Sequence, residues 1–465
     1  MSSENQYDIA ILGGGPGGYI AAIRAARHGL KTALIEKEKI GGTCLHWGCI
    51  PTKGLLQNAQ VFRHCTESDS FGIRTGEVSY DWEAIMERQR GIIDRLHKGV
   101  QSLMKKHQIE VIPGFGRLAS PTSLEVETQE GARIVQAKNI VVATGSVARS
   151  LPGVQLDEER VISNVGALTM KKPPKSLVVI GAGAVGVEFA SIYRTFGAEV
   201  TILEYLPKLV PLEDEEVSKY LFRCFKKAKM NVQLGVAVQT VENRGDHVQV
   251  TYKKGEDLVE MEAEMCLVSV GRKPIVEGIG LDNTKAKVER GVIVVNEYCQ
   301  SDEPTVYAIG DVIGNYLLAH VAEVEGLLAV DHIAGKGPEP IDYSAVPRCT
   351  YCHPQIGSVG LSEKECEEQA IPIEVGKAQF MPNGKAMALG ETDGFSKVIR
   401  HAETGELLGG HIIGPEATDL VMEYVVAKKN RMSAASIAHT IHPHPTLSEV
   451  NLDALHNAIG EPVHG

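Results

Sequence analysis

Apolar residues in this chain gather in short runs that are separated by glycine-rich turns and helical segments. The first run, residues 7–12, leads through such a turn into an alanine-rich helical segment at 19–28 and a second apolar run at 31–35. The middle of the chain repeats this order, with an apolar run at 176–180 before a helix that begins at Val187. Short buried runs joined by helices predict βαβ units with parallel strands.

Three other apolar runs, at 140–143, 266–270 and 306–309, end on short polar motifs. Open α/β sheets bind ligands at the carboxyl ends of their strands, so these motifs are expected to face a bound molecule. An ordinary turn at the end of a strand is the alternative for each. Beyond residue 341 strands alternate with two late helices, which predicts a further domain. The three motifs are Thr144-Gly145-Ser146, Gly271-Arg272 and Gly310-Asp311.

The two glycine-rich turns that follow the strands at 7–12 and 176–180 both carry a dinucleotide-binding fingerprint. Each reads G-x-G-x-x-G, and each has an acid at the end of the next strand. The glycines let a pyrophosphate approach a helix N-terminus, and the acid accepts hydrogen bonds from a ribose. An acid at the second site repels a 2′-phosphate, which favours NAD over NADP. The residues are Gly13, Gly15, Gly18 and Glu36 in the first fingerprint, and Gly181, Gly183, Gly186 and Glu204 in the second.

The stretch 41–53, GGTCLHWGCIPTK, holds two cysteines in a tight spacing, Cys44 and Cys49. A disulfide between them closes a very short ring and adds little stability, so the pair favours a redox role. Two buried free cysteines are the alternative. We expect the glycines to lead into a helix that Pro51 interrupts about two turns on, because proline lacks the amide that a helix interior needs. Thiols near a helix N-terminus ionise more easily.

Composition narrows the class of protein. The chain has 465 residues, an apolar fraction of 43%, a formal charge of −12 and a pI near 5.8. This length predicts about three domains, and the acidic balance argues against nucleic acid or anionic membranes as partners. No apolar run is long enough to span a bilayer, and the N-terminal residues show no targeting pattern. We therefore expect a cytoplasmic protein whose cysteines outside the 44/49 pair are free thiols.

The C-terminal stretch 439–446 is dense in histidine, and Glu449 follows it. Three interpretations compete: a metal site, a solvated loop without a role, and a histidine–carboxylate pair. Prolines in the stretch disfavour a regular ligand face, so no metal is expected. A thiol–disulfide enzyme needs a base to form the attacking thiolate, which favours His444 as that base, oriented by Glu449.

The segment Cys349-Thr350-Tyr351-Cys352-His353 matches the C-x-x-C-H pattern of covalent haem attachment. That attachment takes place in an exported compartment, and the chain shows no export pattern. The segment has strand character, so two ordinary strand or core cysteines are expected. A haem-bearing electron carrier, the interpretation from a different class, would show haem absorbance. A scaffold without catalysis gives no reason for Cys44, Cys49 and His444 together.

Taken together, these motifs resemble the pyridine-nucleotide disulfide oxidoreductases, and within that family the dihydrolipoamide dehydrogenase branch. The redox stretch, both fingerprints, Leu318-Ala319-His320 and the histidine stretch all occur in the family's order, from end to end of the chain. Glutathione reductases place arginines where Glu204 and its followers stand here. Related mercuric and thioredoxin reductases carry extra C-terminal redox cysteines, whereas the last cysteine here is Cys366. His46-Trp47, between the redox cysteines, departs from the family pattern and bears on helix packing and substrate preference.

The resemblance implies FAD at the first fingerprint and NAD at the second. By analogy Gly116 lies near the adenine, Asp311 on the ribityl chain and Ala319 near the pyrimidine end of the flavin. Lys53 lies beside flavin N5 and pairs with Glu188. The resemblance adds Thr43, Thr144, Gly145, Ser146 and Gly271 to the cofactor-binding residues.

The fold implied is α/β, with two Rossmann-like dinucleotide-binding domains and a C-terminal α+β dimerisation domain. The expected boundaries are 1–147 for the first part of the FAD domain, 148–273 for the NAD domain, 274–340 for the central part of the FAD domain and 341–465 for the interface domain. His444 then serves the disulfide of the partner subunit in a homodimer.

The reaction implied is dihydrolipoamide + NAD → lipoamide + NADH. Its partners are a small dithiol or disulfide and, as the E3 component of 2-oxo acid dehydrogenase complexes, lipoyl domains and the E2 core. The alternative within the enzyme class is an NAD(P)H-dependent reductase of another small disulfide.

Overall fold

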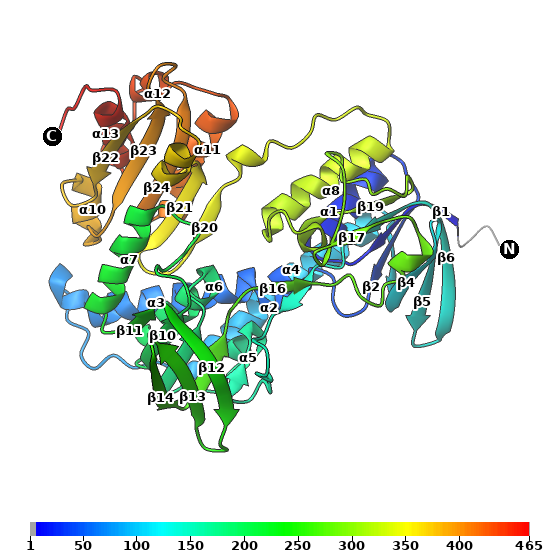
Figure 1. The fold of residues 1–465 in the computed structure, drawn as a ribbon, viewed down its shortest axis with the longest axis horizontal. Helices are drawn as coiled ribbons and strands as arrows, with labels where there is room; N and C mark the ends of the chain where they lie inside the picture. Colours follow the sequence, from blue (N-terminus) through cyan, green and yellow to red (C-terminus); the bar gives the residue numbers. More distant parts are fainter. Residues whose placement is uncertain (1–5, 465) are drawn as a thin grey trace. The chain divides into compact units, whose positions relative to one another are not determined.

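A computed structural model describes residues 6–464 of the chain (Figure 1). The chain divides into two compact units. The first holds the described residues up to Gly54 together with Ala84–Arg149 and Arg272–Ile341. The second holds Leu55–Glu83, Ser150–Gly271 and Asp342 onwards. Two long helices, α3 (Cys49–Thr66) and α4 (Trp82–Lys106), carry the chain from one unit to the other and back.

The first unit is built on a seven-stranded sheet. Its order is β3-β2-β1-β6-β5-β4, with β19 paired to β6. The strands β3, β2, β1, β6 and β19 run parallel, whereas β4 and β5 form an antiparallel extension. The elements of this sheet and its helices are β1 (Gln6–Leu12), α1 (Pro16–Arg27), β2 (Thr32–Glu36), α2 (Gly42–Trp47), β3 (Glu110–Pro113), β4 (Phe115–Ser120), β5 (Ser123–Thr128), β6 (Gly131–Val142), β19 (Val306–Ala308) and α8 (Ala319–Ile333).

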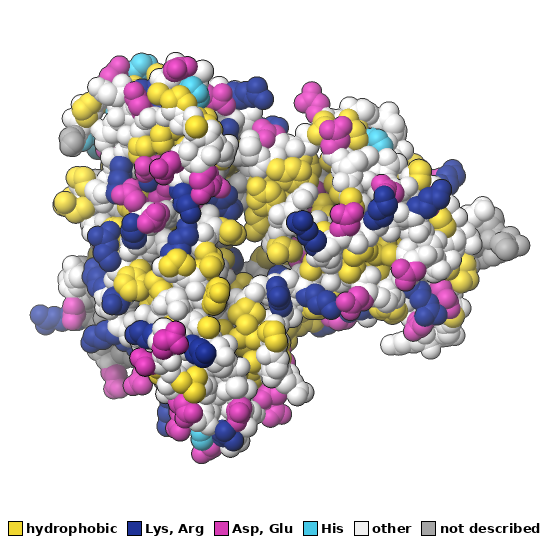
Figure 2. Space-filling view, viewed as in Figure 1, with side chains coloured by type: hydrophobic (Ala, Val, Ile, Leu, Met, Phe, Trp, Pro, Cys, Tyr) yellow, Lys and Arg dark blue, Asp and Glu magenta, His cyan; other side chains and the backbone are white. Residues whose placement is uncertain are grey.

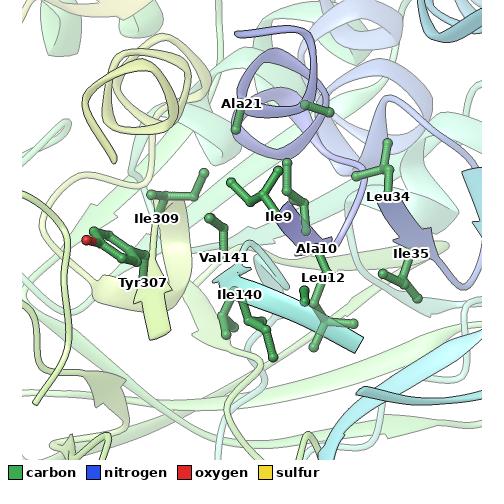
Figure 3. Packing of buried hydrophobic residues seen from close by; sticks show 14 of the residues in the cluster. Ile9, Ala10, Leu12, Ala21, Leu34, Ile35, Ile140, Val141, Tyr307 and Ile309 are labelled. Atoms are coloured by element: carbon green, nitrogen blue, oxygen red, sulfur yellow. The ribbon is translucent and has the colours of Figure 1, made fainter. Parts of the chain in front are cut away.

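Helices α1 and α8 lie side by side against this sheet (Figure 1). They can approach closely because Gly17 and Gly326 have no side chain. A Cβ on Gly17 would lie 2.8 Å from the Ala322 carbonyl oxygen, and one on Gly326 would lie 2.7 Å from the Gly17 carbonyl oxygen. Beneath them the central strands contribute near-continuous apolar side chains, including Ile9 and Val141 (Figure 3). Parallel strands buried on both faces need such unbroken apolar runs.

Short elements complete the first unit. The strands β7 and β16 pair antiparallel, and so do β17 and β18. The bounds are β7 (Ser146–Ala148), β16 (Arg272–Pro274), β17 (Val288–Glu289), β18 (Val292–Ile293) and the 3₁₀ turns η3 (Leu281–Asn283) and η4 (Gly310–Ile313).

The second unit contains a five-stranded parallel sheet of order β11-β10-β9-β15-β8, and a small antiparallel sheet β12-β13-β14 is inserted in the chain between β11 and β15. This arrangement and that of the first unit confirm the predicted α/β class with parallel sheets. The bounds are η2 (Ser68–Phe71), β8 (Val161–Ile162), α5 (Asn164–Thr169), β9 (Ser176–Ile180), α6 (Ala184–Thr195), β10 (Glu199–Glu204), α7 (Glu215–Lys227), β11 (Asn231–Leu234), β12 (Val236–Asn243), β13 (Val248–Lys254), β14 (Asp257–Ala263) and β15 (Met265–Val268).

The C-terminal part of the second unit is an antiparallel sheet of order β20-β21-β24-β23-β22 with helices around it. Within the described residues these helices are five, so the expectation of two late helices was wrong. Three of the five are only five or six residues long, and such short segments carry no clear helical period. The bounds are η5 (Tyr343–Ala345), β20 (Arg348–Thr350), β21 (Gln355–Gly360), α9 (Glu363–Glu368), β22 (Ile373–Gln379), α10 (Gly384–Leu389), β23 (Phe395–His401), β24 (Leu407–Gly414), α11 (Ala417–Lys429), α12 (Ala434–Ala438) and α13 (Glu449–Ala458).

None of the helices between residues 6 and 464 combines the length and the apolar character that a crossing of a bilayer requires.

A buried imidazole in strand β24 predicts acid sensitivity of the second unit. His411 is completely buried, its Nε2 donates to the Leu361 carbonyl oxygen at 2.9 Å, and its Nδ1 has no hydrogen-bond partner among the described residues. Burial lowers the pKa of His411, against the opposing charge of Asp214. The unfolded chain therefore binds this proton more readily, so the free energy of unfolding should fall as the pH drops below about 6.5.

The expected slope is up to about 1.4 kcal/mol per pH unit for one proton, measured by urea unfolding between about pH 7 and pH 5. His411→Gln should flatten the slope, whereas His439→Gln, at an exposed histidine, should leave it unchanged. Equal slopes in wild type and His411→Gln would contradict the assignment.

Candidate active site

The redox stretch forms two consecutive helices rather than one interrupted by proline. Cys44 lies on α2, the chain turns at Gly48 with φ −145° and ψ −109°, and Cys49 is the first residue of α3. The predicted break at Pro51 was therefore wrong. Pro51 lies in the first turn of α3, where a missing amide costs little because that amide has no partner within the helix. The Thr52 hydroxyl donates to the Gly48 carbonyl oxygen at 2.6 Å and fixes the turn.

Cys44 and Cys49 are joined in a disulfide with their Cα atoms 4.6 Å apart. The other seven cysteines are free thiols, as the sequence predicts. Because the bridge closes a ring of only a few residues, it constrains little of the unfolded chain. Its place at the start of the 18-residue helix α3 puts the Cys49 sulfur where a thiolate is stabilised once the bridge is reduced.

The redox stretch packs directly against the first fingerprint. The Gly41 amide donates to the Gly14 carbonyl oxygen at 2.7 Å, and a Cβ on Gly42 would lie 2.7 Å from the Gly15 Cα. Gly41 and Gly42 both have positive φ, at 105° and 56°, a region that glycine adopts without a steric penalty. The disulfide is thus held beside the turn that the sequence assigns to a dinucleotide.

The first fingerprint has the geometry that its sequence predicts. Gly13 ends β1 with φ 114°, and Gly15 caps the N-terminus of α1. A Cβ on Gly18 would collide with the Gly13 carbonyl oxygen, whereas a Cβ on Gly15 would meet no atom within 4 Å. Glu36 accepts hydrogen bonds from the backbone amides of Gly14 and Glu38, each at 2.7 Å. The turn therefore leaves open space at the helix N-terminus with a carboxylate beside it.

All three predicted strand-end motifs contribute a side chain to one polar cluster of the first unit. The Ser146 hydroxyl donates to the Asp311 carboxylate, and the Arg272 guanidinium donates to the Ser146 hydroxyl at 2.6 Å and to its carbonyl oxygen at 2.7 Å. Arg272 Nε lies 3.6 Å from the Asp311 carboxylate. Burial lowers the pKa of Arg272, although the carboxylate opposes that effect. The cluster fixes where the Asp311 carboxylate lies.

The remaining predicted residues of the first unit lie around the same edge of its sheet. Thr144 Oγ1 donates to the Ile275 carbonyl oxygen at 2.7 Å, and the Gly145 carbonyl oxygen accepts from the Ile275 amide at 2.9 Å. Gly116 on β4 packs against Leu12 and Ile35, where a Cβ on Gly116 would lie 2.7 Å from Leu12 Cδ1. Ala319 opens helix α8, Thr43 lies in the first turn of α2, and Lys53 lies in the first turns of α3.

The second fingerprint repeats the first almost atom for atom. Gly181 has φ 96°, and Gly183 caps α6, where an added Cβ would meet no atom within 4 Å. A Cβ on Gly186 would collide with the Gly181 carbonyl oxygen. Glu204 accepts from the Ala182 amide at 2.6 Å and from the Leu206 amide at 2.8 Å. Gly271 lies shortly after strand β15 and has φ 114°. A Cβ on Gly271 would also meet no atom within 4 Å.

Glu188 is buried on helix α6 and accepts a hydrogen bond from the Tyr351 amide at 2.8 Å. The family resemblance pairs Glu188 with Lys53. Lys53 belongs to the first unit and Glu188 to the second, so this pairing stays a prediction.

The histidine stretch separates into three imidazoles with different acid partners. His444 Nδ1 lies 2.9 Å from Glu449 Oε1, and its side chain is 80% exposed. His442 Nε2 lies 2.7 Å from Glu423, and His439 Nε2 lies 3.4 Å from Glu461. In the described part of the chain no three His, Cys, Asp or Glu side chains form a group that could hold a metal ion.

Glu449 is fixed by two hydrogen bonds. One oxygen accepts from His444, and the other accepts from the Thr446 amide at 2.8 Å. Although burial opposes the effect, these bonds and the His444 charge lower the pKa of Glu449. A carboxylate held this way orients the imidazole, leaving Nε2 as its outward nitrogen.

Several residues that position the redox stretch escaped sequence reasoning. Gln89 on α4 donates to the Pro51 carbonyl oxygen, and His97 on α4 donates to the Ile40 carbonyl oxygen at 3.0 Å. His46 donates to that same oxygen at 2.9 Å, and its ring contacts Trp47 at 5.2 Å between centroids. These contacts hold His46, on α2, against α4, where its ring centroid lies 5.0 Å from that of His97. The sequence gave no local signal for these contacts, because α2 and α4 are far apart in the chain.

The C-x-x-C-H segment is only partly a strand. Cys349 lies in β20, which ends at Thr350, and Cys352 is fully buried beyond it. Cys352 Sγ contacts the Pro354 carbonyl oxygen at 3.3 Å, and burial raises the pKa of the Cys352 thiol.

Comparison with known proteins finds relatives that match nearly the full length of the chain. Residues 7–326 match the family model described as pyridine nucleotide-disulphide oxidoreductase, and residues 346–455 match the dimerisation domain of the same family. A dihydrolipoyl dehydrogenase of Bacillus subtilis is 44% identical over 470 residues, covering 99% of each chain. One of Chlorobaculum tepidum is 42% identical, covering 98% of this chain and 97% of its own. The crystal structure of LpdA from Mycobacterium tuberculosis matches with a TM-score of 0.90 at 26% identity, covering 97% of this chain and 99% of its own.

Proposed function

The chain belongs to the pyridine nucleotide-disulphide oxidoreductase family and, within it, to the dihydrolipoyl dehydrogenases, and we propose that it catalyses dihydrolipoamide + NAD → lipoamide + NADH. The resemblance noted in the sequence is thereby confirmed. The observation that carries the reaction is the Cys44–Cys49 disulfide beside the first fingerprint. A short-ring disulfide at a helix N-terminus accepts two electrons from a dithiol with little loss of folding stability.

The thiol chemistry needs a base, and His444 is the residue that the geometry supports. Glu449 occupies its Nδ1, so Nε2 is the nitrogen that takes a proton from a substrate thiol. The substrate thiolate then attacks Cys44 Sγ, the Cys44–Cys49 bond breaks, and Cys49 leaves as a thiolate at the N-terminus of α3. The second substrate thiolate attacks the mixed disulfide, which releases lipoamide and leaves Cys44 reduced.

The homodimer belongs to this proposal. The match of residues 346–455 to a dimerisation domain supports a pairing of two copies of the chain. His444 and Glu449 lie within that domain, and we place them in the service of the disulfide of the partner subunit. The exposure of His444 leaves its Nε2 open to such a role.

The residues at both fingerprints fit the FAD and NAD that members of this family use. At each turn the glycine that caps the helix borders open space, and glutamate oxygens that already accept one amide keep a lone pair for a ribose hydroxyl. A bound FAD would supply the two-electron chemistry that links the reduced Cys44–Cys49 pair to NAD. We assign FAD to the first fingerprint, because the glycines of the redox stretch pack against it, and NAD to the second.

We assign the Asp311 cluster, Thr144, Gly145, Gly116 and Ala319 to the FAD site, since they lie in the same unit as the first fingerprint. Lys53 is proposed beside the flavin. As the E3 component of a 2-oxo acid dehydrogenase complex, the homodimer would take its substrate from lipoyl domains carried on an E2 core. The relatives' shared name supports this partner.

A paired assay tests the proposed reaction. The purified homodimer should form NADH rapidly from dihydrolipoamide and NAD, and it should use NADP and glutathione disulfide poorly. Poor turnover of dihydrolipoamide, together with rapid reduction of another disulfide by NAD(P)H, would overturn the substrate assignment while leaving the redox pair in place.

Substitutions in the second fingerprint separate nucleotide binding from folding. Gly183→Ala adds a methyl group to open space, so the chain should fold normally and bind NAD at least about tenfold more weakly. Gly186→Ala drives a methyl group into the Gly181 carbonyl oxygen, so it should lower the thermal unfolding temperature as well. Calorimetric titration with NAD and thermal unfolding measure the two effects. Unchanged NAD affinity in Gly183→Ala would remove NAD from this turn.

A further inference from the structure

A pocket of about 450 Å³ lies in the second unit beside helix α7. Its walls come from the loop after β10, from α7 and from strands β11, β22 and β23. Neither Glu204 nor a fingerprint glycine lines it, so it is separate from the site assigned to NAD. Figure 2 shows Lys and Arg side chains gathered around apolar ones over this helix.

Four cations line the pocket, in a chain whose net charge is −12. Glu216 is the one acid in the lining, and it pairs with Lys377 and with the buried Lys397. Lys208 Nζ donates to a backbone carbonyl oxygen at 2.9 Å, and Arg223 lies over the Tyr220 ring. Among the described residues no carboxylate forms an ion pair with Lys208 or Arg223. The four cations are Lys208, Lys219, Arg223 and Lys377.

The remaining residues of the lining are apolar except for Ser218, whose hydroxyl donates to the Leu209 carbonyl oxygen at 2.6 Å. Phe222 and Leu234 are half-buried and face it, with Pro207 at its edge. Lys219 pairs with Glu215 at 2.6 Å, so Lys208 and Arg223 are the two cations of the lining that form no ion pair with a carboxylate of the described residues. Two such cations beside an aromatic wall suit a ligand with a ring at one end and an anionic group at the other. A bare inorganic anion would leave the apolar wall unused.

The loop at 207–209, which forms one wall of the pocket, is hydrogen-bonded at both ends to the second fingerprint. The Leu206 amide donates to Glu204 at 2.8 Å, and the Val210 amide donates to the Ala182 carbonyl oxygen at 2.9 Å. In the chain, Lys208 lies between Leu206 and Val210, the two residues that make these hydrogen bonds. Val210 has φ 39°, a conformation that is strained for a β-branched residue. Contacts that a ligand makes with the loop at 207–209 therefore act on the segment that carries Glu204.

We propose that this pocket binds a small amphipathic anion, an aromatic ring bearing a phosphate, and that its occupation strengthens NAD binding at the second fingerprint. The second half rests on the proposed function, because it takes NAD as the ligand of that fingerprint. A ligand that holds the loop at 207–209 in place removes ordering that NAD would otherwise have to impose on Glu204 and Leu206.

Calorimetric titration of the homodimer with naphthyl phosphate tests the pocket, with naphthol and inorganic phosphate as separate arms. Naphthyl phosphate should bind, and each of the two fragments should bind at least about tenfold more weakly. The double variant Lys208→Gln/Arg223→Gln should weaken naphthyl phosphate at least about tenfold. Arg244→Gln/Lys253→Gln removes two cations from another part of the same unit and should leave binding unchanged. Equal losses in both double variants, or equal affinity for inorganic phosphate, would overturn the proposal.

Titration of NAD with and without saturating naphthyl phosphate tests the coupling. The Kd for NAD should fall about fivefold or more, and the Kd for naphthyl phosphate should fall by the same factor when NAD is present. This linkage should disappear in Lys208→Gln/Arg223→Gln. An unchanged Kd for NAD in the presence of naphthyl phosphate would overturn the coupling. Binding of the probe through Lys208 and Arg223 in a chain that binds no NAD would instead overturn the proposed function and leave the pocket standing.

Discussion

A His444→Gln variant is expected to oxidise dihydrolipoamide at least about 10²-fold more slowly than the wild type. Glutamine has nearly the reach of histidine but cannot take a proton, so the substrate thiol would have to ionise unaided. The hydrogen bond from His444 Nδ1 to Glu449 fixes which nitrogen acts, because it leaves Nε2 for the thiol. Steady-state formation of NADH from dihydrolipoamide and NAD measures the effect, with most of the loss in kcat.

Two matched variants show whether the loss belongs to this imidazole. His439→Gln changes an exposed histidine of the same stretch, bonded to Glu461 instead of Glu449, and should retain wild-type turnover. Glu449→Gln should cost less than His444→Gln, since the amide can still accept from one neighbour while no longer stabilising an imidazolium. Wild-type turnover in His444→Gln, or an equal loss in His439→Gln, would remove His444 from the mechanism.

The βαβ units were predictable because their information is local. Each needs an apolar run, a glycine pattern and an acid within about forty residues, and the structure places both fingerprints as the sequence predicts. The helix starts were predicted three residues late in each case, at residues 19 and 187 in place of Pro16 and Ala184. Gly18 and Gly186 were assigned to the turns, yet they lie in the first helical turn, where the absence of a Cβ lets helix and strand touch.

The break in the redox stretch shows the limit of a residue-by-residue interpretation. Proline is a strong helix breaker in a helix interior, and that rule gave the wrong position. The actual break at Gly48 puts Pro51 in a first turn, where proline is well tolerated. Which of two breakers ends a helix depends on the packing of both segments, and here Gln89 of α4 holds the Pro51 carbonyl oxygen in place.

Side-chain partners from distant segments were the least predictable part of the site. Arg272, Ser146 and Asp311 come from three separate strand ends, and each motif alone is an ordinary turn. The sequence marked all three motifs but assigned no role to Arg272, because Asp311 is distant in the chain and meets Arg272 only in the fold. The link between His442 and Glu423 on α11 had no such signal.

A Cys49→Ser variant is expected to keep its bound FAD and lose turnover of dihydrolipoamide by at least about 10³-fold. Serine preserves the size of the side chain, so helix α3 should persist, and so should the contacts of Gly41 and Gly42 with the first fingerprint. Without Cys49 the substrate thiolate has no disulfide to attack, and no covalent route transfers the electron pair. The flavin absorbance of the purified variant and NADH formation from dihydrolipoamide measure the two halves of the prediction.

Cys65→Ser supplies the control, because Cys65 is a free thiol on the same helix α3. It should bind FAD and turn over like the wild type. Thiol titration under denaturing conditions, before and after reduction, should show the wild type gaining two reactive thiols on reduction and Cys49→Ser gaining none. The second result follows because the partner of Cys44 is gone while the other cysteines are already free. Turnover by Cys49→Ser close to that of Cys65→Ser would mean that electrons reach the flavin without this disulfide, and the assignment of the Cys44–Cys49 pair would fail.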